Sequence, residues 1–153
     1  MKRSPKAVAK AKEVAYLASL VKKIVLARDG YRCWYCGGKE DLQAAHILSV
    51  GASNRLRFEP FNVVTMCLKD HIFGWHRDPA KYIVALEVKF PGRYDALQIM
   101  ARTAPKIDYK LLKIVLELGC ASVKGARRES VNTVAAVGKF GGRGHLHSTQ
   151  GEE

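Results

Sequence analysis

The chain has 153 residues, of which 48% are hydrophobic and 26% are charged. This length suits a single domain with its own core. The composition excludes collagen-like, disordered and disulfide-dense secreted classes. No apolar run approaches the roughly 20 residues that a membrane helix needs, so we expect no membrane partner and a cytoplasmic location.

The charge balance favours a polyanionic partner. Lysine and arginine number 26 against 14 aspartate and glutamate residues, for a formal net charge of +12. A surface of this charge attracts nucleic acid, although a basic surface also serves solubility without any partner. We therefore expect DNA as the partner, subject to what the motifs indicate.

The first half of the chain is expected to contain one helix and two strands. Helical spacing of apolar residues predicts a basic helix over residues 7–28, with Gly30 just past its end. Residues 31–67 contain short apolar pieces and β-branched residues, which predict two short strands. A long loop, residues 51–60, separates them.

Helices are expected to dominate the second half. Three are predicted, one opening at Pro79 and ending before Pro91-Gly92, the others covering 94–100 and 107–118. Asp78 suits the N-cap of the first, and Gly119 is the expected end of the last. The basic, glycine-rich residues 121–153 are expected to form a partly disordered tail.

Three cysteines and a histidine have the spacing of a zinc site. They form a C-x-x-C and a C-x-x-x-H pair, namely Cys33, Cys36, Cys67 and His71. In a chain without a disulfide framework, this set predicts a structural Zn²⁺ ion with tetrahedral ligands. Asp70 is the rival fourth ligand. Cys120 lies far along the chain and is interpreted as a small core residue.

The residues around the zinc pairs resemble the HNH endonucleases of the zinc-supported, ββα-metal type. The matching pieces are Cys33-x-x-Cys36-Gly37, Ala45-His46, Leu56-Arg57-Phe58, Asn62 five positions before Cys67, and Trp75-His76-Arg77-Asp78-Pro79. Within that family the pattern is most similar to the phage NinG (Rap) recombination endonucleases. The resemblance covers about residues 28–100.

The resemblance implies an α+β fold with a zinc-stapled ββα-metal core and additional N- and C-terminal helices. Residues 1–120 would then be a single nuclease domain. Its parts are a basic helix at 7–28, a zinc and ββα core at 31–78 and a helical extension at 79–119.

The resemblance also implies site residues. His46 is the general base that activates the attacking water, and Asn62 holds the His46 loop or ring in place. His76 binds a catalytic divalent cation, either Mg²⁺, Mn²⁺, Ni²⁺ or Zn²⁺. The basic residues expected to contact DNA are Arg57, Lys69 and Arg77.

The choice of the fourth zinc ligand depends on helix geometry. On a regular helix, residues five apart point about 140° away from each other. His71 and His76 are then badly placed to share one ion, which favours His71 on zinc and His76 on the catalytic metal. If Gly74 distorts the helix, both histidines serve the active site and Asp70 completes the zinc set.

The expected activity is metal-dependent hydrolysis of DNA phosphodiester bonds, on branched or recombining DNA in phage replication. Many HNH enzymes carry a metal-binding Asp or His where this chain has Ala45. This departure motivates an alternative, a zinc-ribbon DNA-binding protein with a decayed nuclease site. An HNH nuclease of a mobile, packaging or restriction system is a third interpretation. A monomer and a homodimer both remain open.

Overall fold

The structure is a computed structural model that describes residues 4–137, with side chains up to residue 123. Its helices are α1 (Pro5–Arg28), α2 (Pro79–Lys89), α3 (Arg93–Thr103) and α4 (Tyr109–Val137), and its strands are β1 (Leu42–His46) and β2 (Val63–Cys67). Short helical turns η1 (Asn54–Leu56) and η2 (Pro60–Asn62) join the strands, and a π-helix, η3 (Lys69–Trp75), follows them. The mixed α+β class expected from the sequence is confirmed.

The two strands form an antiparallel hairpin at the centre of the molecule. Their register pairs Leu42 with Cys67 and His46 with Val63. Side chains alternate across β2, so Val64 and Met66 face one hydrophobic cluster while Val63 faces the other. The hairpin therefore separates two cores.

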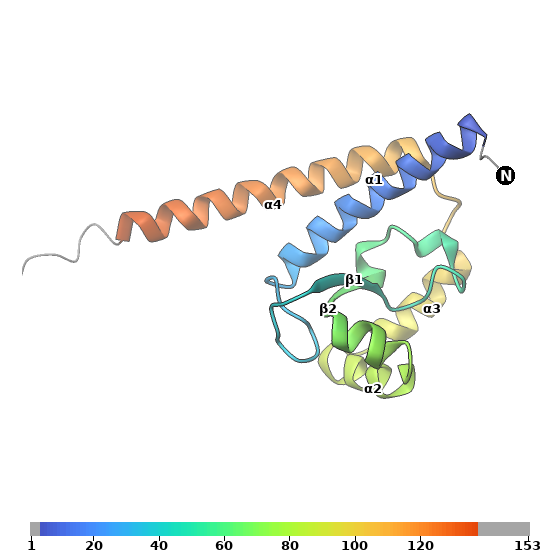
Figure 1. Cartoon of the computed structure of the whole chain (residues 1–153), viewed down its shortest axis with the longest axis horizontal. Coiled ribbons are helices and arrows are strands. Elements are labelled where there is room, and N and C mark those ends of the chain that lie inside the picture. Colours follow the sequence, from blue (N-terminus) through green and yellow to red (C-terminus); the bar gives the residue numbers. More distant parts are fainter. Residues whose placement is uncertain (1–3, 138–153) are drawn as a thin grey trace, which may run out of the picture.

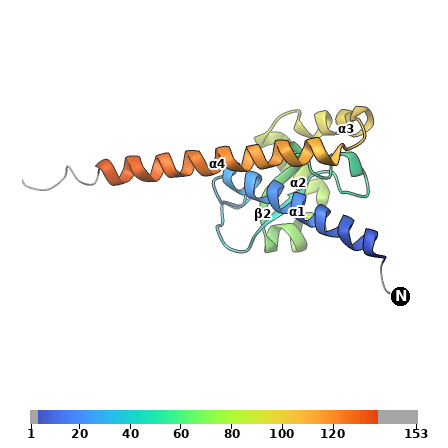
Figure 2. The same cartoon turned by 90° about the horizontal axis from the view of Figure 1, so that it is seen from above.

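The first core lies between the hairpin and the pair formed by α1 and α4. Leu17, Leu20, Val21 and Val25 of α1 are buried there, together with Leu116 of α4. Figure 1 shows α1 and α4 along one side of the molecule, and Figure 2 shows that the two helices diverge toward the N-terminus of α1. The second core lies on the opposite side of the hairpin, between the hairpin and the group formed by η3, α2 and α3 (Figure 1).

Local capping signals explain where α1 and α2 begin. The Ser4 hydroxyl accepts a hydrogen bond from the Ala7 amide at 3.3 Å, and Pro5 occupies the first turn of α1. Asp78 caps α2 in the same way, accepting from the Lys81 amide at 3.3 Å. Pro suits such positions because its missing N–H is not needed there. The expected start of α2 at Pro79 is confirmed.

The last helix is longer than the sequence indicates, because α4 continues through Gly119 to Val137. A methyl group at Gly119 would lie 3.1 Å from the Ile24 side chain of α1. This glycine therefore allows close helix packing rather than ending the helix. Cys120 is buried beside it, which confirms the core interpretation. Of the tail predicted at 121–153, the part beyond residue 137 lies outside the described residues.

Among the described helices, none has both the length and the apolar character needed to cross a membrane.

Candidate functional site

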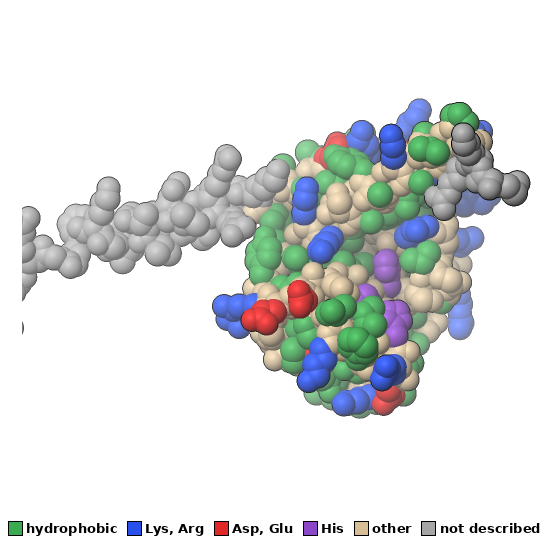
Figure 3. Space-filling model, viewed as in Figure 1, with side chains coloured by type: hydrophobic (Ala, Val, Ile, Leu, Met, Phe, Trp, Pro, Cys, Tyr) green, Lys and Arg blue, Asp and Glu red, His purple; other side chains and the backbone are tan. Residues whose placement is uncertain are grey.

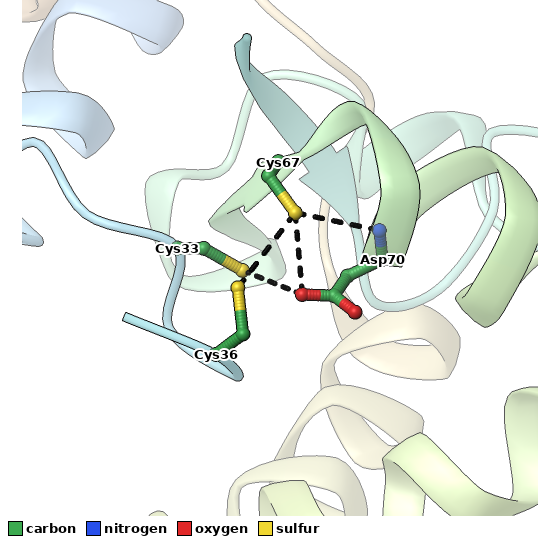
Figure 4. Close-up of side chains that lie close together, drawn as sticks. All are labelled: Cys33, Cys36, Cys67 and Asp70. Atoms are coloured by element: carbon green, nitrogen blue, oxygen red, sulfur yellow. Dashed lines mark hydrogen bonds between the residues drawn. The ribbon is translucent and has the colours of Figure 1, made fainter. Parts of the chain in front are cut away.

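A group of side chains that could hold a metal ion forms where the Cys33–Gly38 turn meets the end of β2. The ligand atoms of Cys33, Cys36, Cys67 and Asp70 all lie within 4.8 Å of one another (Figure 4). The sulfurs of Cys36 and Cys67 are 3.8 Å apart. Zn–S bonds of about 2.3 Å give a tetrahedral edge of about 3.8 Å. The group can therefore hold a metal ion, and its spacing fits a tetrahedral thiolate site.

Backbone hydrogen bonds hold the turn in this position. The Gly37 amide donates to the Cys33 carbonyl at 2.9 Å, and the Cys33 amide donates to the Gly38 carbonyl at 2.7 Å. Gly37 has a φ of +75°, a conformation that favours glycine. The Trp34 amide donates to the Thr65 carbonyl at 2.8 Å, which ties the turn to the free edge of β2.

Asp70 enters this group from η3 and is buried. Its Oδ2 atom lies 3.2 Å from the sulfurs of both Cys33 and Cys67. Burial opposes ionisation of Asp70, but hydrogen bonds from the thiols and from Tyr82 outweigh it and lower the pKa of this carboxyl. The hydrogen bond to Asp70 in turn raises the pKa of Cys36 to about 12. A bound cation reverses such a shift, because a coordinated thiol loses its proton.

His71 lies outside this ligand set, contrary to the preference based on a regular helix. The reason is that η3 is a π-helix, whose hydrogen bonds join residues five apart. The His76 amide donates to the His71 carbonyl at 3.2 Å, so the two side chains share one face. At Gly74 any Cβ would collide with the Tyr82 hydroxyl, so glycine allows η3 to pack on α2. This matches the alternative expected if Gly74 distorts the helix, in which Asp70 joins the cysteines and the two histidines lie together.

His71 and His76 form a pair with converging ring nitrogens. Their Nε2 atoms are 3.2 Å apart. Two nitrogens at this spacing, each about 2.1 Å from a shared ion, subtend about 100° at it. This angle suits both tetrahedral and octahedral coordination. The described residues thus offer a second position at which two imidazoles can hold a cation.

Gln43 of β1 fixes the orientation and tautomer of His71. Its Oε1 atom lies 2.7 Å from His71 Nδ1. Because a carbonyl oxygen only accepts, Nδ1 carries the proton and Nε2 keeps its lone pair toward His76. Burial, and then the charges of His76 and His46, lower the pKa of His71 and favour its neutral form. No sequence pattern pointed to Gln43, since a glutamine on a strand is an ordinary surface residue.

His46 stands at the end of β1 near this pair. Its Nε2 atom lies 2.8 Å from the Arg57 carbonyl, so Nε2 carries the proton and Nδ1 keeps a lone pair. The ring lines a hollow of about 440 Å³ that it shares with Arg57 and Lys22. Figure 3 shows histidine side chains gathered on one face, with lysine and arginine side chains around them.

Asn62 is completely buried and supports the chain that follows His46. Its Oδ1 accepts from the Leu48 amide at 2.8 Å. Its Nδ2 donates to the carbonyls of Leu48 at 3.0 Å and Leu56 at 3.2 Å. The structure therefore brings Asn62 to the backbone of the His46 loop and not to the imidazole ring.

The three basic residues expected at DNA lie in different places. Arg57 is half-buried beside His46. Arg77 follows His76 and its guanidinium lies 5.5 Å from the centre of the Phe73 ring. Lys69 is exposed and borders a hollow beside Cys67, on the metal-binding side of β2. Arg57 thus shares a hollow with His46, while Arg77 adjoins His76 in the chain.

Comparison of the chain with protein-family models, curated proteins and solved structures gave no match. Its function is therefore inferred from the motif residues and from their geometry.

Proposed function

We propose that this protein is a metal-dependent endonuclease of HNH type that hydrolyses phosphodiester bonds in DNA. One observation carries the proposal. His46, whose Nδ1 has no hydrogen-bond partner among the described residues, is close enough to His71 to lower its pKa, and the Nε2 atoms of His71 and His76 converge at 3.2 Å. A base beside a cation position is what hydrolysis of a phosphodiester requires. The net charge of +12 favours the polyanionic substrate.

In the proposed reaction, His46 accepts the proton of the attacking water at Nδ1. Its bond to the Arg57 carbonyl engages Nε2 and leaves Nδ1 as the nitrogen that takes the proton. His71 and His76 would hold a divalent cation, which would supply positive charge to the transition state and to the leaving 3′-oxygen. The guanidinium of Arg57 adds charge next to His46.

The ligand set of Cys33, Cys36, Cys67 and Asp70 is proposed to hold a structural Zn²⁺ ion. Three thiolates and a carboxylate give the soft, tetrahedral donor set that Zn²⁺ accepts. Such an ion would join the turn after α1, the end of β2 and the start of η3. Because Asp70 directly precedes His71, the zinc site would also fix one member of the histidine pair.

Plasmid nicking tests the proposal. Supercoiled DNA is incubated with the zinc-loaded protein and Mg²⁺, Mn²⁺ or Ni²⁺, and wild type is compared with His46→Ala. His145→Ala is the matched control, because it removes a histidine that has no proposed role. Loss of nicking in His46→Ala alone supports the nuclease. Nicking that survives His46→Ala at the wild-type rate rejects His46 as the base.

A DNA-binding protein without cleavage is the second candidate, and Ala45 favours it. This residue is 1% exposed within the core and offers no metal ligand beside His46. The second candidate predicts salt-dependent binding with no cleavage under any of these cations. Branched junctions, the substrate that the NinG resemblance suggests, should be tested in the same way. Cleavage of either substrate excludes this alternative.

A further inference from the structure

A basic cavity of about 740 Å³ lies at the free edge of β2, on the edge that does not pair with β1. The end of α1, the turn with the metal-binding cysteines and the start of α3 enclose it. None of the described histidines lines it. It is therefore separate from the candidate catalytic residues.

Arg93 is the most buried cation of this cavity, at 7% exposure. Its guanidinium donates to the carbonyls of Phe61 at 2.6 Å and Val63 at 3.2 Å. It lies 4.9 Å from the Phe61 ring centre and 5.1 Å from that of Phe90. Among the described side chains it forms no ion pair, since the lining carboxylate, Asp29, is bound by Arg28 at 2.7 Å.

Positive charge is thus in excess at this position. Burial, and then the nearby charge of Arg28, lower the pKa of Arg93 to about 10. Arg32 and Lys89 also line the cavity and are exposed. Four cations therefore face a single carboxylate. An anion bound here would relieve the repulsion between the guanidinium groups.

The rim of the cavity is aromatic as well as basic. Phe61 is 39% exposed and Tyr35 is 37% exposed. A basic groove with exposed rings is typical of proteins that bind single-stranded nucleic acid, where phosphates meet the cations and bases stack on the rings. An acidic peptide would use only the cations. The combination favours a nucleotide over a carboxylate ligand.

We infer that this cavity binds a nucleotide of single-stranded DNA, with its phosphate at Arg32 and Arg93 and its base against Phe61. The inference takes DNA as the ligand from the proposed function and adds a strand-binding site away from the histidines. It gives the protein a second contact with a DNA strand that has left its duplex, as strands do at a branch.

Fluorescence anisotropy of a labelled oligothymidine, without added divalent cation, tests this inference. Phe61→Leu should weaken binding about fivefold or more, because a stacked base is lost, and should leave the salt dependence unchanged. Arg32→Ala should weaken binding and reduce the slope of log K against log salt by about 0.7. Lys110→Ala, an exposed cation of α4 outside the cavity, is the matched control. Zinc content and thermal melting verify that each variant is folded.

Two results would overturn the inference. The first is wild-type affinity in Phe61→Leu, and the second is an effect of Lys110→Ala as large as that of Arg32→Ala. Failure of the nuclease proposal is distinguishable from both. A wild type that binds through Phe61 and Arg32 but never nicks DNA supports this site and rejects the nuclease. If wild type nicks DNA and Phe61→Leu binds the oligonucleotide with wild-type affinity, the nuclease proposal is supported and this site is rejected.

Discussion

Replacing Asn62 by alanine should destabilise the protein strongly. The side chain is fully buried and makes three hydrogen bonds, one to the Leu48 amide and two to the carbonyls of Leu48 and Leu56. Alanine leaves all three backbone groups without their partner. At about 0.5–1.5 kcal/mol for each bond, the free energy of unfolding should fall by about 3 kcal/mol.

Urea unfolding of the zinc-loaded protein, followed by tryptophan fluorescence, measures this loss. With a slope of about 1–3 kcal/mol per molar urea, the midpoint should fall by roughly 1–3 M. Asn54→Ala is the matched control, because Asn54 is exposed on η1 and substitutions at such positions change stability by only about 0.5 kcal/mol.

Equal midpoints for Asn62→Ala and Asn54→Ala would refute this reasoning, since the three bonds would then contribute nothing. Nicking adds a second readout. Because Asn62 supports the loop after His46, Asn62→Ala should also lose most nicking at temperatures where it remains folded.

Three further predictions concern the metal-binding groups. Asp70→Ala should release zinc to a chelator faster than wild type, while His71→Ala should not, because only Asp70 belongs to the ligand set. Equal release rates from the two variants would contradict that ligand set. Gly74→Ala should lose about 1–3 kcal/mol in urea unfolding because its methyl group meets Tyr82. Gly51→Ala should not, because its methyl group would make only an ordinary contact with the Ser49 hydroxyl, at 3.8 Å. Gln43→Leu should weaken Ni²⁺ binding to the zinc-loaded protein about 10–100-fold in calorimetry, because His71 loses its hydrogen-bond partner; unchanged affinity would mean that Gln43 does not orient His71.

Local signals made most elements of the fold predictable. The cap at Asp78 and the proline after it act within one helical turn, so the start of α2 follows from four residues. β2 follows from its β-branched residues, whereas β1 has none and was predictable only as a short apolar piece. The prediction that the last helix ends at Gly119 was wrong, because the role of this glycine depends on Ile24 of α1, which is distant in sequence. A local pattern contains no information about this tertiary contact.

The residue types of the candidate site were predictable, but which residues come together in each group was not. The cysteine spacing indicates a metal group, and the structure brings the three cysteines together. The choice between Asp70 and His71 depends on the π-helical hydrogen bonds of η3, which form where Gly74 packs on Tyr82. The partnership of Gln43 with His71 likewise depends on how η3 lies over β1.

The packing of α1 against α4 affects the order in which parts of the protein can fold during synthesis. Tyr16 of α1 donates to Glu117 at 2.6 Å, and the Cys120 thiol donates to the Leu20 carbonyl at 3.5 Å. Every metal-ligating cysteine, Asp70 and the three clustered histidines precede α4 in the chain. During synthesis, the residues of both candidate sites are therefore made before the helix that packs on α1. Contacts this distant in sequence form slowly, so the face of α1 that packs on α4 is covered by that helix only late in folding.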